Sequence, residues 1–146
     1  MFVNIPDEAY KFEPIDYLAN GKNCVYTAQI LKDGPDKLKK NYPMRVLLVH
    51  GIELLLQAFI LHFDKSKFIR VHDIKKLYSL AEKIDNSLNL NLLTNDLSCA
   101  INDVVLDYYS DSVKARYKNK DSSLNFSLFL ILKKSLIQPL EKAIHL

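Results

Sequence analysis

The segment from Met44 to Phe63, MRVLLVHGIELLLQAFILHF, is the feature that most constrains the fold. Read at 3.6 residues per turn it is apolar on nearly every side, a pattern typical of a helix enclosed by other helices. A polar stripe of His50, Glu53 and Gln57 follows one face of this helix. A buried polar group without a partner costs about 1–3 kcal/mol, so the stripe is the first candidate for a functional site.

The stripe has two interpretations. In the first, His50, Glu53 and Gln57 line a polar cleft that binds a nucleotide or an RNA base, with the histidine as a proton carrier near neutral pH. In the second, the three side chains hydrogen-bond to a neighbouring helix and only fix the register of the packing. The residue types fit both.

Helical periodicity continues along the rest of the chain. We expect a first helix from Cys24 to Lys32 with Asn23 as its N-cap, preceded by one helical turn that Asn20-Gly21 ends. Apolar residues three and four apart predict further helices at about 72–84, 95–109 and 124–145. Pro139 lies inside the last helix and should kink or split it.

These elements predict an all-α protein, an up-and-down bundle of four to five helices with a short irregular N-terminal arm. We assign residues 1–22 to the arm and 23–146 to a single bundle domain. Glycine is scarce and no strand alternation is visible, which favours helices over a sheet.

Composition limits the classes of function. Cys24 and Cys99 lack the spacing of metal ligands or of a disulfide framework, and a reducing cytoplasm fits them best. No secretory signal follows Met1. The central segment is long enough to span a bilayer, but its charged and polar residues argue against a membrane location. We therefore expect a cytoplasmic protein without a cofactor or a metal.

The net charge of +3 is unevenly distributed: bases dominate residues 22–76 and 114–146, and acids dominate 1–21 and 77–113. Attraction within the fold explains this pattern as well as an anionic partner does. Two basic clusters can hold phosphates: Arg70, His72 and Lys75, and Lys114, Arg116, Lys118 and Lys120. Three tyrosines near the second cluster can stack on bases or bury their rings: Tyr108, Tyr109 and Tyr117.

Asp103, Asp107 and Asp111 are four residues apart, and we expect a solvated helix face there rather than a cation site.

The order of these segments resembles that of HEPN domains (higher eukaryote and prokaryote nucleotide-binding) over about residues 23–146. The second helix of that family carries a His or Gln, a small residue and Glu-Leu within an apolar run, matched here by His50, Gly51, Glu53 and Leu54. The next helix opens with His-Asp-Leu-x-x-Leu, matched by His72, Asp73, Ile74 and Leu77. A tyrosine and an Arg-Tyr pair close the fourth helix, matched by Tyr108 or Tyr109 with Arg116 and Tyr117.

The resemblance implies a homodimeric nucleotide- or RNA-binding module, or a module paired with a nucleotidyltransferase-type protein. Many HEPN domains are metal-independent ribonucleases, whose site is an Arg followed several residues later by a His. Here Arg116 is followed by Tyr117 and Lys118, and the next histidine is the distant His145. Arg45 and His50 have the spacing but lie on the second helix, so we treat that match as chance.

This departure favours a non-catalytic binding or interaction module. The alternative is a ribonuclease, a toxin or defence effector, with a degenerate site that uses Arg116. From the resemblance and the stripe, we take as ligand-binding candidates His50, Glu53, Gln57, His72, Asp73, Tyr109, Arg116 and Tyr117. We also expect Glu53 to pair with Arg116 inside the bundle, because Glu53 is an acid on an apolar helix and Arg116 belongs to the Arg-Tyr pair of the resemblance.

Overall fold

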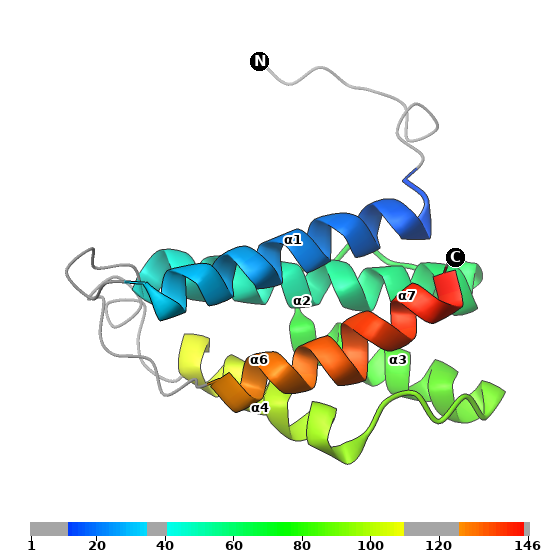
Figure 1. Cartoon of the computed structure of the whole chain (residues 1–146). Coiled ribbons are helices and arrows are strands. Elements are labelled where there is room, and N and C mark those ends of the chain that lie inside the picture. Colours follow the sequence, from blue (N-terminus) through cyan, green and yellow to red (C-terminus); the bar gives the residue numbers. More distant parts are fainter. Residues whose placement is uncertain (1–11, 35–40, 110–125, 145–146) are drawn as a thin grey trace.

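The computed structural model describes residues 12–34, 41–109 and 126–144 (Figure 1). Helices make up nearly all of these residues, and no strand occurs among them. The elements are α1 (Pro14–Asp33), α2 (Asn41–Phe63), the 3₁₀ turn η3 (Lys65–Lys67), α3 (Ile74–Leu88), α4 (Asn95–Tyr109), α6 (Phe126–Leu132), the π-helical segment η4 (Lys133–Ile137) and α7 (Gln138–Ile144). Since α6, η4 and α7 continue one another, five helices form a compact bundle, which confirms the expected fold class.

Helix α2 is the central member of the bundle, as its apolar run predicts. It packs against α1, α3, α4 and α7, and Leu48, Ile52 and Leu56 on it are fully buried. Tyr42–Phe63 is long and apolar enough to cross a membrane: an 18-residue window within it has a mean hydropathy of 1.9, but 61% of that window is buried inside the protein. The core helix of a soluble protein can be equally long, apolar and buried, so the hydropathy of this helix is weak evidence for a membrane span.

Helix α1 is longer than the sequence suggests. The expected start at Cys24 is wrong, because the helix begins at Pro14 and runs through Asn20-Gly21 without a break. It thus includes residues 14–22 of the segment assigned to the arm. Gly21 is a contact residue rather than a stop: a Cβ there would lie 2.9 Å from Leu55 Cγ and 3.0 Å from the carbonyl oxygen of Gly51. Figure 1 shows α1 lying along α2, and the two glycines allow this close approach.

A buried ion pair joins α2 to α4. Arg45 Nε lies 2.8 Å from Asp107 Oδ2, and the two side chains are only 2% and 4% exposed. The expectation that Asp107 belongs to a solvated acidic face is therefore wrong. Asp103, on the same helix, is exposed as expected, and Asp111 lies outside the described residues. The charge of Arg45, an arginine in an otherwise apolar helix, explains why Asp107 turns inward.

The last helix departs from regular α geometry just before its proline. Pro139 has no N–H to donate to the carbonyl of Ser135, and the π-helical segment η4 occupies the turn in front of it. The helix axis nevertheless continues from α6 into α7 (Figure 1). The helix is therefore not split at Pro139, and the irregularity takes the form of a widened turn within one helix.

Candidate functional site

The polar stripe of α2 contacts the chain that leads into α3. Gln57 Nε2 donates a hydrogen bond to the carbonyl oxygen of Val71 at 3.3 Å. One turn earlier, Glu53 Oε2 lies 3.2 Å from Nδ1 of His72. The stripe therefore holds the connection after η3 against α2, whereas the sequence suggested a neighbouring helix as its partner.

Glu53 is a buried carboxylate between two exposed imidazoles. Its side chain is 8% exposed, and the same oxygen that contacts His72 lies 3.8 Å from Nδ1 of His50, one turn earlier on α2. The rings of His50 and His72 are 53% and 87% exposed. Each imidazole is thus held near the carboxylate through Nδ1. We name His50, Glu53 and His72 the His-Glu-His face.

Asp73 has a structural contact of its own. It is the N-cap of α3, and its carboxylate accepts a hydrogen bond from the backbone N–H of Lys76 at 3.2 Å. The helix therefore begins at Ile74, two residues later than the sequence suggests. Because the cap lies between His72 and the first turn of α3, it fixes the backbone that carries the histidine.

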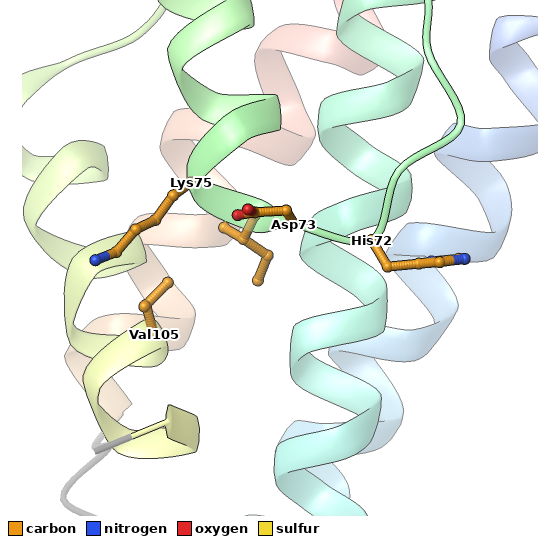
Figure 2. A pocket seen from close by; sticks show the side chains of 5 residues that line it. His72, Asp73, Lys75 and Val105 are labelled. Carbon is orange, nitrogen blue, oxygen red and sulfur yellow. The ribbon is translucent and has the colours of Figure 1, made fainter.

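A pocket of about 410 Å³ opens beside the start of α3. It is lined by His72, Asp73, Ile74, Lys75 and Val105, the last of these from α4. Figure 2 shows Lys75 extending toward α4 and the ring of His72 pointing to the opposite side. These two side chains diverge, so the basic cluster Arg70, His72 and Lys75 does not converge on one phosphate.

The remaining candidates are placed only in part. Tyr109 ends α4, and its side chain lies outside the described part of the chain, as do Arg116 and Tyr117. The expected pairing of Glu53 with Arg116 therefore stays a prediction. Within the described residues, Glu53 contacts histidines instead.

Two features of the site were missed from the sequence. His72 and Glu53 were each candidates, but their contact was not expected, because it depends on the path of the connection over α2. Arg45 and Asp107 were missed as a pair, although an arginine within an apolar run was a usable signal. In the described ranges, no group of three or more His, Cys, Asp or Glu side chains is arranged to hold a metal ion.

No family model matches the chain, and no curated protein or solved structure is significantly similar to it.

Proposed function

We propose that this chain is a non-catalytic, HEPN-like binding module, and that its His-Glu-His face binds an unpaired base of RNA or of a nucleotide. One observation carries the proposal: His72 is almost fully exposed, yet it is held in place by a buried carboxylate. An exposed histidine without such a contact has no fixed ring orientation, and Glu53 supplies one.

A fixed imidazole offers two kinds of contact to a base. Aromatic rings, including histidine, stack on unpaired bases in single-stranded RNA. With Nδ1 directed at Glu53, the Nε2 atom is left to accept a hydrogen bond when the ring is neutral and to donate one when it is protonated. His50 places a second imidazole beside the same carboxylate.

The divergence of His72 and Lys75 favours base stacking over a phosphate clamp as the main contact. Stacking has little sequence preference, because every base presents a π-face. The proposed ligand class is therefore single-stranded RNA or a free nucleotide, without a defined sequence.

The experiment is a fluorescence-anisotropy titration of the full chain with a labelled, mixed-sequence single-stranded RNA. Base–aromatic stacking contributes about 1–3 kcal/mol per base, so His72→Ala should weaken binding by roughly five- to 150-fold. His72→Phe keeps an aromatic face but loses the contact with Glu53, so it should recover only part of the affinity that His72→Ala loses. A merely structural role for His72 predicts equal losses in both variants.

His62→Ala is the matched control, since His62 is also exposed and lies on α2, but its ring contacts Phe63 rather than Glu53. An equal loss of affinity in His62→Ala would contradict a specific site, and so would the absence of any RNA binding by the unchanged protein.

The second candidate is the metal-independent ribonuclease. A carboxylate on Nδ1 with Nε2 directed outward is also the arrangement of a general base. Incubation with mixed RNA in the presence of a chelator separates the two functions. The binding module leaves the RNA intact, whereas cleavage that is lost in both His72→Ala and Arg116→Ala would establish the ribonuclease.

The resemblance also supports proposing a homodimer and a nucleotidyltransferase-type partner. Light scattering coupled to size-exclusion chromatography tests the dimer directly. A monomeric mass at concentrations of tens of micromolar would contradict it.

A further inference from the structure

A second pocket, on the last helix, is separate from the His-Glu-His face. Its volume is also about 410 Å³, within the range of small-molecule sites, and it is lined by Leu92, Lys134, Gln138, Pro139, Lys142 and Ala143. Lys134, Gln138 and Lys142 are four residues apart along the helix and therefore share one side of it. Leu92 comes from the connection between α3 and α4.

The wall that carries Leu92 is held by a buried carboxylate. Asp85, 6% exposed, accepts hydrogen bonds from the backbone N–H groups of Leu92 at 3.0 Å and Leu93 at 3.4 Å. Asn89 and Asn91 have φ angles of 52° and 55°, in the left-handed region that asparagine tolerates. The loop is thus folded back on the end of α3 in a defined conformation.

The opposite wall is shaped by the irregular turn of the last helix. Lys134 lies within η4, and Pro139 is the second residue after this segment ends at Ile137. A π-helical turn is wider than an α-helical turn, and such turns often occur at functional sites. Pro139 and Ala143 supply apolar surface between the polar residues.

The two charged side chains that line this pocket, Lys134 and Lys142, are both positive. None of the described residues that line it is acidic. Glu141, the nearest acid along α7, forms an ion pair with Lys22 of α1 at 3.0 Å. Within residues 12–34, 41–109 and 126–144, neither Lys134 nor Lys142 forms an ion pair, and both are exposed.

We propose that this pocket binds a small organic anion with an apolar body. The anionic group lies over Gln138, where the long, flexible side chains of Lys134 and Lys142 reach it from the turns before and after. The amide of Gln138 adds a donor. The apolar body packs on Leu92, Pro139 and Ala143.

The experiment is a titration of the ¹⁵N-labelled full chain with octanoate, followed by amide chemical shifts. Saturable shifts are expected at Leu92, Gln138 and Ala143. Exposed ion pairs contribute about 0.2–1 kcal/mol, so Lys134→Gln and Lys142→Gln should each raise the Kd by up to about fivefold. Lys133→Gln is the matched control: it removes the same charge from the same helix at an exposed position that does not line the pocket, and it should leave the Kd unchanged.

Three comparison ligands make the outcome decisive. Octyl phosphate should bind at the same residues, because its head group is also anionic. If octanol binds as tightly as octanoate, the negative charge does not contribute to binding. If inorganic phosphate binds as tightly as octanoate, the apolar body does not contribute. Either result would contradict the proposed ligand class. An equal rise of the Kd for octanoate in Lys133→Gln would overturn the proposed site. The absence of saturable shifts at the amides of Leu92, Gln138 and Ala143 would also overturn it.

Discussion

At the residue scale, the ion pair of Arg45 and Asp107 combines a distance of 2.8 Å with almost complete burial of both side chains. Two charges that are almost fully removed from water pay a desolvation cost, which their attraction offsets only while both are present. The pair therefore contributes little net stability, but it specifies how α2 packs against α4. Its effect appears when one partner is removed.

Asp107→Asn should lower the free energy of unfolding by about 3–5 kcal/mol, because the buried Arg45 loses the carboxylate oxygen that its Nε contacts at 2.8 Å. Urea denaturation measures this change. The double variant Arg45→Met, Asp107→Leu should lose less than the sum of the two single variants. Asp103→Asn, an exposed position on the same helix, should change stability by no more than about 0.5 kcal/mol. An equal effect of Asp103→Asn would contradict the argument.

Burial should change the pH dependence of the reactivity of Cys24. Burial raises the pKa of the Cys24 thiol, whereas Cys99 is exposed. The thiolate is the reactive form, and a raised pKa lowers the fraction of Cys24 that is thiolate at a given pH. The midpoint of the plot of alkylation rate against pH therefore moves to a higher pH. Iodoacetamide rates in Cys99→Ser, measured from about pH 7.5 to 10, give this midpoint. When the same assay is done in urea, burial of Cys24 is lost and the midpoint should move to a lower pH. An unchanged midpoint would contradict the prediction.

At the element scale, the crossing of α1 and α2 depends on the absence of two side chains. A Cβ on Gly51 would lie 2.9 Å from Val25 Cγ2 and 3.0 Å from both Cys24 Cβ and the carbonyl oxygen of Gly21. Two of these three neighbours are a backbone atom and a Cβ, which cannot move without shifting a helix. The helices therefore pack at a distance that only glycine permits.

Gly51→Ala should destabilise the protein by up to about 2 kcal/mol in total, because overpacking typically costs about 1–3 kcal/mol. This loss opposes the gain of about 1 kcal/mol that alanine normally brings to a helix. Asn23→Ala, at an exposed position of α1, should show the propensity gain without the overlap. Thermal or urea unfolding compares the two variants, and a Gly51→Ala protein that is more stable than its parent would show that the helices can separate freely.

The sequence predicted some elements well because their patterns are local. The amphipathic period of α3 and the Thr94-Asn95 start of α4 both depend on near neighbours in the chain, and both elements were found close to their expected places. Gly21 was misread for the opposite reason. Its local signal, Asn-Gly, indicates a stop, and only the distant Gly51 explains a glycine inside the helix.

At the scale of the whole molecule, α2 connects nearly every other helix. It contacts α1, α3, α4 and α7, and its side chains from Ile52 to Ile60 are buried, except for the half-buried Leu54. A bundle with one shared central helix is expected to unfold as a single cooperative unit, because no pair of helices keeps a core without it.

Leu56→Ala should lower the free energy of unfolding by about 2–5 kcal/mol, the usual cost of a large core truncation. In native-state hydrogen exchange, the slowest amides of α1, α3 and α4 should lose protection by the same amount as those of α2. Loss of protection in α2 alone would show that the bundle consists of independent units.

The sequence by itself determined that the chain is helical, that Met44–Phe63 is the central helix and that His50, Glu53 and Gln57 share a face, because these properties depend on side-chain period. Only the tertiary structure decided the partners. Val71 and His72 meet the stripe, Asp107 meets Arg45, and Leu92 meets the last helix because the chain folds back over itself. Such contacts join residues far apart in the sequence, and a local pattern carries no information about them.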